Sequence, residues 1–129
     1  KLQAAGVDTR VIVVALPDLN GQSRSTAPER ATVAELWTNR SWKLFQQWML
    51  ANASDWTAPN IPPADGDALR TSAVQIGRDL IDQLTPLMKE NGIGPGYPLL
   101  VWWAKDGQLH ARVCDDPHTF RFVLKELGA

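Results

Sequence analysis

The chain has 129 residues, 44% of them hydrophobic and 21% charged, so it is long enough to bury one hydrophobic core, and one domain is expected. Its formal net charge of -1 gives no electrostatic reason to expect nucleic acid or an anionic membrane as a partner. No apolar run approaches the roughly 18 residues of a membrane span, and no segment has the pattern of a signal peptide. Cys114 is the only cysteine, which excludes an internal disulfide, a Cys-x-x-Cys pair and a thiolate metal cluster within this chain.

The first extended segment is predicted near the amino terminus. Residues 1–6 look like the end of a helix closed by glycine, and without an initiator methionine they indicate a piece of a longer protein. Residues 7–16 contain an uncharged run rich in β-branched side chains, which predicts a central strand buried on both faces. The turn-forming residues 17–23 end it.

Two helices are predicted next. Thr26, with a proline in the first turn and Glu29 three positions on, has the pattern of a capping box, and the helix is expected to run to about Trp37. Ser41 can cap a second helix, in which large apolar side chains recur at helical spacing and are predicted to face the core. An exposed aromatic surface for an unfolded client is the alternative interpretation of these side chains: Trp42, Phe45, Trp48 and Met49.

A long helix is expected after a loop at residues 52–67. The helix is predicted to begin at Asp67 or Thr71, and Pro86 should break or kink it around Thr85 because proline lacks the backbone N–H. Asn91-Gly92 should end the segment. Its apolar positions are Val74, Ile76, Leu80, Ile81, Leu84, Leu87 and Met88.

A β-hairpin and a final helix complete the chain. Residues 99–103 form an uninterrupted apolar run that predicts a strand covered on both sides, and Asp106-Gly107 provides the turn into a second strand at residues 109–113. Pro98 can begin the first strand, and on spacing alone the bond before it is expected to be trans. Asp116-Pro117 should open the last helix, whose apolar side is formed by Phe120, Val123, Leu124 and Leu127.

Residues with reactive or ligating side chains are few. His110 and His118 lie on either side of Cys114, but His118 follows a proline-containing turn and no carboxylate spacing completes a site, which argues against a metal site or a Cys-His pair. Asp115 and Asp116 are interpreted as a helix cap.

Two other motifs have simple structural interpretations. Asp79 and Asp82 are expected on the solvated face of the long helix. The glycine-rich residues 92–96 have neither the lysine nor the following helix of a phosphate-binding loop.

Three segments resemble the catalytic domain of the DsbC/DsbG family of periplasmic thiol:disulfide interchange proteins. They are residues 5–17, residues 42–48 with Asn60-Ile61-Pro62, and residues 96–101 continuing through Asp106-Gly107 to the last helix. The resemblance implies an α/β, thioredoxin-like fold with a central mixed sheet, a C-terminal antiparallel hairpin and helices on both faces. It also implies one N-terminally incomplete domain over residues 1–129, with a helical insertion at about residues 26–91.

The same resemblance implies a substrate-binding site at Gly96, Tyr97 and Pro98. It places Pro98 at the family's cis-proline, so Tyr97-Pro98 is predicted to be cis, and it places Tyr97 where the family usually has a small hydroxyl residue that helps to present a substrate chain. The family's Cys-x-x-Cys does not occur in this sequence, and Cys114 matches neither of its cysteines. The redox cysteines are therefore expected upstream, and Cys114 is predicted to be structural.

The function implied is thiol-disulfide exchange or isomerisation on periplasmic protein disulfides, without a cofactor or a metal. The expected partners are unfolded or misoxidised proteins, with a membrane redox protein and an N-terminally mediated homodimer as further options, and no nucleic acid. Two alternatives stay open. One is a redox-inactive binding or chaperone module that uses the groove beside Tyr97-Pro98, and the other is an unrelated α/β domain.

Overall fold

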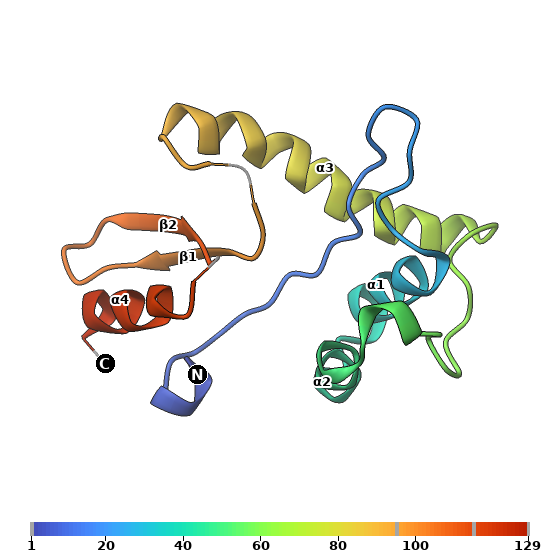
Figure 1. Ribbon diagram of the computed structural model, residues 1–129, viewed down its shortest axis with the longest axis horizontal. Coiled ribbons are helices and arrows are strands. Elements are labelled where there is room, and N and C mark those ends of the chain that lie inside the picture. The colour runs from blue at the N-terminus through green and yellow to red at the C-terminus, as the bar shows by residue number, and fades with distance from the viewer. Residues whose placement is uncertain (1, 95, 115, 129) are drawn as a thin grey trace. The chain divides into compact units, whose positions relative to one another are not determined.

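The computed structural model describes residues 2–94, 96–114 and 116–128 (Figure 1). The described residues form a mixed α/β structure with four α-helices and one two-stranded antiparallel hairpin. The helices are α1 (Ala27–Asn39), α2 (Trp42–Leu50), α3 (Ala68–Glu90) and α4 (His118–Leu127), with short 3-10 turns at Gln3–Ala5 and Ala53–Asp55; the strands are β1 (Leu99–Trp103) and β2 (Leu109–Val113).

The chain divides into two compact units. We call Ile12–Asp82 the helical unit, and Lys1–Val11 together with Gln83–Ala129 the hairpin unit. This division does not test the prediction of one domain with a helical insertion, which stays a prediction. No helix in the described part of the chain has both the length and the apolar character needed to cross a membrane.

The first two helices begin where their capping residues predict. Thr26 Oγ1 accepts a hydrogen bond from the Glu29 backbone N–H at 3.2 Å, and the Glu29 carboxylate accepts one from the Thr26 N–H at 3.0 Å. This completes the predicted capping box of α1. Ser41 caps α2 in the predicted way, since its hydroxyl accepts from the Leu44 N–H at 3.1 Å.

The aromatic face of α2 is only partly core. Trp48 packs against the buried cluster of the helical unit, which consists of Ala15, Val33, Ala34, Ala64 and Val74. Trp42 stacks on Phe45 with ring centroids 5.1 Å apart, but Met49 keeps 55% of its surface exposed, and no α2 residue is fully buried. The predicted core face of α2 is therefore wrong for Trp42 and Met49, while Phe45 and Trp48 are partly buried.

The predicted central strand at residues 7–16 is wrong. This segment lies wholly within the described residues and is extended, but it pairs with no other strand, and Ile12 is 62% exposed. Its carboxyl end is held by side chains instead. The indole Nε1 of Trp37 donates to the Val13 carbonyl at 2.9 Å, and the Arg78 guanidinium donates to the Ala15 carbonyl at 3.4 Å. A β-branched run becomes part of a sheet only when another strand forms hydrogen bonds with its backbone N–H and C=O groups. No described segment forms such a ladder with residues 7–16.

Helix α3 continues through Pro86, so a break near Thr85 is wrong, while the kink predicted as the other outcome stays a prediction. Proline removes a single N–H from the helix ladder, and the turn after it is stabilised by the C-terminal cap. Gly92 adopts a left-handed conformation with φ 68°, its N–H donates to the Lys89 carbonyl at 3.2 Å, and the Ile93 N–H donates to the Met88 carbonyl at 2.8 Å. These two bonds form a Schellman motif at the predicted Asn91-Gly92 stop.

The hairpin has two different faces. Strands β1 and β2 pair antiparallel with Val101 opposite Ala111, so alternate side chains of both strands share a face. One face, which we call the inner face, packs on α4, where Trp102 and Val123 are buried together with Leu2. The outer face consists entirely of apolar residues: Leu99, Val101, Trp103, Leu109, Ala111 and Val113.

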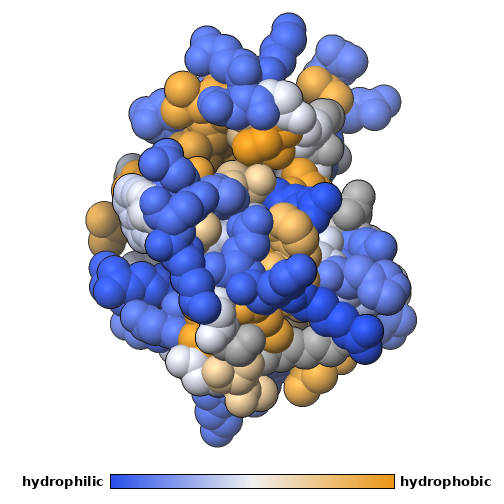
Figure 2. All heavy atoms as spheres, turned by 90° about the vertical axis from the view of Figure 1, so that its left-hand side faces the viewer, coloured by the Kyte–Doolittle hydropathy of each residue, from blue (hydrophilic) through white to orange (hydrophobic). Residues whose placement is uncertain are grey.

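The outer face is not covered as predicted. Trp103 is 68% exposed, and Val101 and Leu109 are exposed as well. In Figure 2, hydrophobic surface lies in separate patches among hydrophilic groups on the face that is shown. Among the described residues the sheet has two strands only, so the predicted central mixed sheet is not formed and the coarser α/β description is what the structure supports.

The last helix follows its predicted pattern. Asp116 Oδ1 accepts from the His118 N–H at 2.9 Å at the start of α4, although the N-cap position itself is Pro117, and Asp115 lies outside the described residues. Phe120, Leu124 and Leu127 pack around Val123 on the inner face of the hairpin. Gly128 ends the helix in a left-handed conformation.

Candidate functional site

The loop that leads into β1 contains the three predicted site residues. The Tyr97-Pro98 peptide bond is cis, as the family resemblance predicted. The Pro98 carbonyl accepts a hydrogen bond from the Cys114 N–H at 2.7 Å, which ties the loop to the end of β2. A Cβ atom at Gly96 would lie 2.9 Å from the Val113 side chain, so only glycine fits here without displacing that valine.

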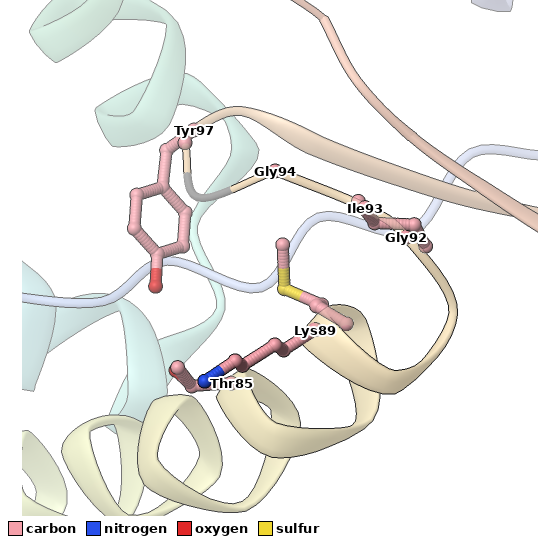
Figure 3. Close-up of a pocket in the computed structure, with 8 residues that line it drawn as sticks. Thr85, Lys89, Gly92, Ile93, Gly94 and Tyr97 are labelled. Atoms are coloured by element: carbon pink, nitrogen blue, oxygen red, sulfur yellow. The ribbon is translucent and has the colours of Figure 1, made fainter.

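A hollow of about 420 Å³ lies between the end of α3 and this loop (Figure 3). A volume of this size is within the range of roughly 300–1,000 Å³ that small-ligand sites occupy. Its described lining consists of two short stretches of the hairpin unit: Thr85, Met88 and Lys89 from α3, and Gly92, Ile93, Gly94, Gly96 and Tyr97 from the loop.

The hollow combines an apolar base with polar groups on one side. Met88 is buried, and the Schellman cap places Ile93 next to it, since a contact between these two positions of the motif is usual. In Figure 3 the Tyr97 ring extends from the loop, with its hydroxyl directed toward the part of α3 that carries Thr85 and Lys89. Tyr97 is 49% exposed, so the ring forms a wall that solvent and a ligand can both reach.

Lys89 supplies the positive charge of the site. Its side chain is exposed and lies along α3 toward Thr85, one turn earlier (Figure 3). Within the described residues, Lys89 has no carboxylate within ion-pair distance. The lysine also lies in the last helical turn, where a cation is favoured by the helix dipole, which is its simplest structural role.

A second polar cluster lies on the inner face of the hairpin, and its role is structural. Glu126 Oε2 accepts from the Trp102 indole N–H at 3.0 Å and lies 3.0 Å from His110 Nδ1. On its other side, His110 Nε2 lies 3.5 Å from Asp106. The Trp102 and His110 rings are also in contact, with centroids 5.8 Å apart. These bonds fasten α4 to the hairpin.

The histidines and Cys114 do not converge on a ligand site. His110 binds carboxylates across the inner face, whereas His118 is the first residue of α4. In the described ranges, no group of three or more His, Cys, Asp or Glu side chains is arranged to hold a metal ion. Cys114 is half-buried and forms no disulfide within the chain.

The structure brings some predicted site residues together and adds others. Gly96 and Tyr97 line the hollow, and Pro98 follows directly after them. Sequence reasoning did not find Thr85, Met88 and Lys89, because the site forms only where the end of α3 meets the loop. The Asn91-Gly92 stop was the available signal, since a helix that ends in a Schellman turn reverses direction and places its last turn beside the residues that follow.

Comparison with protein-family models, with curated proteins and with solved structures finds no match to this chain.

Proposed function

We propose that this chain is the substrate-binding part of a thiol-disulfide oxidoreductase or isomerase that acts on periplasmic protein disulfides. The redox cysteines of the proposed enzyme lie upstream of Lys1. The observation that carries the proposal is the order of the hairpin unit: a loop containing Gly96, Tyr97 and Pro98 enters β1, β2 returns beside it, and α4 closes the inner face. This order is the one that the family resemblance implies.

The loop has the properties that presentation of a polypeptide requires. It is anchored by the bond from the Cys114 N–H to the Pro98 carbonyl and by the close fit of Gly96 on Val113, so it needs little ordering when a substrate binds. Tyr97 adds an exposed aromatic surface at its centre. A preorganised loop with one accessible aromatic ring suits an extended chain of variable sequence.

The chemistry would be ordinary thiol-disulfide exchange. A thiolate attacks one sulfur of a substrate disulfide, a new S–S bond forms, and the other substrate sulfur leaves as a thiolate. The described residues contribute to this reaction by holding the substrate chain. The partners would be misoxidised or unfolded proteins, and the location would be the periplasm.

The test is insulin reduction by the full-length protein in the presence of dithiothreitol. We expect turnover that is lost when upstream cysteines are replaced by serine. Tyr97→Ala should raise KM several-fold with a smaller change in kcat, because the ring contributes to substrate binding rather than to the exchange step. Trp103→Ala is the control, since it removes an exposed aromatic ring that neither lines the hollow nor belongs to the aromatic face of α2. A folded full-length protein without turnover would refute the enzyme.

A redox-inactive binding module is the second candidate, and one observation favours it. The chain contains the loop and the hollow but only one cysteine, so its own residues can hold a polypeptide and cannot form a redox pair. Suppression of client aggregation by a full-length protein that lacks insulin reductase activity would support this candidate and exclude the first.

A further inference from the structure

We propose that the hollow between α3 and the loop recognises a glutamate side chain of a bound polypeptide, with Lys89 as the residue that selects it. The inference deepens the proposed function, because the occupant is a segment of the polypeptide that the loop presents. It concerns which sequences bind and is independent of whether disulfide exchange follows.

The first argument is the chemical match between the hollow and a glutamate. An apolar base formed by Met88 and Ile93 suits the methylene groups of the side chain. The Lys89 ammonium can pair with the carboxylate, and the Tyr97 hydroxyl, directed toward the same part of α3 in Figure 3, can donate to it. A neutral apolar ligand would pair with neither the Lys89 ammonium nor the Tyr97 hydroxyl.

The second argument is charge complementarity. Lys89 is the one charged residue in the described lining of the hollow, and it has no carboxylate within ion-pair distance among the described residues. An unpaired ammonium attracts an anionic group, and because the Lys89 side chain is exposed, solvent screening keeps this attraction modest.

The glycines that line the hollow favour a polypeptide as its occupant. Gly92 is needed for the left-handed cap of α3, and Gly96 is needed because of Val113. Gly94 has neither constraint, and nothing lies within 4 Å of where its Cβ would be. The missing side chain at Gly94 therefore leaves an open rim, where another backbone can approach closely and form main-chain hydrogen bonds.

The experiment uses full-length protein labelled with isotope-enriched glycine, because three glycines line the hollow and report on it directly. The probes are acetyl-Leu-Glu-Leu-amide and acetyl-Leu-Gln-Leu-amide. We expect the glutamate peptide to shift the Gly92, Gly94 and Gly96 amide signals and to bind about fivefold more tightly than the glutamine peptide. Equal affinities, or shifts confined to other glycines, would overturn the inference.

Variants separate recognition from folding. Lys89→Gln should remove the preference for glutamate while the far-UV circular dichroism stays the same, and Lys43→Gln, at an exposed position on α2, should leave the preference intact. Lys89→Glu should transfer the preference to acetyl-Leu-Lys-Leu-amide. A merely structural lysine would not produce this exchange of preference, so its absence would contradict the proposal.

Two further outcomes are informative. Hexanoate that shifts the same signals with the affinity of the glutamate peptide would show a site for free carboxylates and overturn the assignment to a polypeptide. Glutamate preference in a protein without insulin reductase activity would support this inference and refute the proposed enzyme, whereas reductase activity without the preference would do the reverse.

Discussion

The two units differ in how completely their own residues cover their apolar surface. In the helical unit, Val33 and Ala34 are fully buried, and the backbone of the extended segment is bound by the side chains of Trp37 and Arg78. In the hairpin unit, α4 covers the inner face, but the outer face has six apolar residues of which Val101, Trp103 and Leu109 are exposed.

The two units are stabilised by different kinds of contact: hydrogen bonds from side chains to the backbone in the helical unit, and packing of a helix on a sheet face in the hairpin unit. In the helical unit, the side chains of Trp37 and Arg78, from helices distant in sequence, bind backbone carbonyls that a neighbouring strand would otherwise bind. The hairpin can cover one face with the helix that follows it in sequence, and covering the other face requires a second element. Packing on α4 therefore accounts for the buried Trp102 of the inner face, whereas no described element covers the wholly apolar outer face.

The largest expected loss of stability comes from replacing Trp102, the buried tryptophan of the inner face, by alanine. Trp102→Ala should destabilise the hairpin unit by roughly 3–5 kcal/mol, because it leaves a cavity beside Val123 and removes the donor to Glu126. Amide hydrogen exchange would show the loss as faster exchange in β1 and β2, with α1 unchanged.

The neighbouring residue is the matched control. Trp103→Ala removes the same side chain from the outer face, where most of it is exposed, and should change exchange in β1 and β2 far less than Trp102→Ala. Equal effects of the two substitutions would mean that the outer face is covered in solution and that the two faces are alike.

A smaller effect is expected in the candidate site loop. Gly96→Ala should destabilise the hairpin unit by about 1–3 kcal/mol, since its Cβ would lie 2.9 Å from Val113 Cγ1 and the strand end would have to shift. Urea unfolding followed by circular dichroism measures this loss. Gly94→Ala, where the new Cβ meets open space, should be close to neutral, and an equal loss at both positions would argue against the described loop packing.

The smallest effect concerns the acid stability of the helical unit. Two hydrogen bonds from Arg30, at 2.8 and 2.7 Å, hold the pKa of Asp65 below its ordinary value of 3.8. A carboxyl whose pKa is lower in the folded state stabilises the fold above its unfolded pKa, and this contribution is lost as the pH falls through the folded value. Because the Asp65 side chain is 54% exposed, solvent screening keeps the contribution of the pair to the free energy of unfolding below about 1 kcal/mol.

Asp65→Asn tests this expectation. Stability measured by urea unfolding should fall less steeply between about pH 5 and pH 2 in the variant than in the unaltered protein. Asp79→Asn is the matched control, since Asp79 accepts a bond from Gln75 of its own helix instead of an arginine. Identical acid profiles for Asp65→Asn and the unaltered protein would show that the pair contributes nothing.

Local chemistry explains what could be predicted about the fold. The cap at Thr26 and Glu29, the cap at Ser41 and the Asp106-Gly107 hairpin each involve residues only a few positions apart. Their geometry is therefore set by neighbouring residues and needs no distant partner.

The wrong predictions involve distant partners. Residues 7–16 have the composition of a buried strand, but whether they pair depends on a second strand elsewhere in the chain. Pro86 predicts a break from its own chemistry, whereas the outcome also depends on the Schellman turn at Gly92 and on the buried side chain of Met88. Of the residues that line the hollow, Gly96 and Tyr97 were among the predicted substrate-binding residues and Lys89 was not, and substrate binding by them stays a prediction.

The sequence by itself determined where the helices begin, where the hairpin turns and which loop precedes β1, because capping and turn residues act over a few positions. Only the tertiary structure decided which apolar segment pairs, which face of the hairpin is covered, and that Lys89 and Tyr97 line the same hollow. These outcomes depend on free energies of packing between segments that are distant in sequence, and composition or periodicity does not specify the partner.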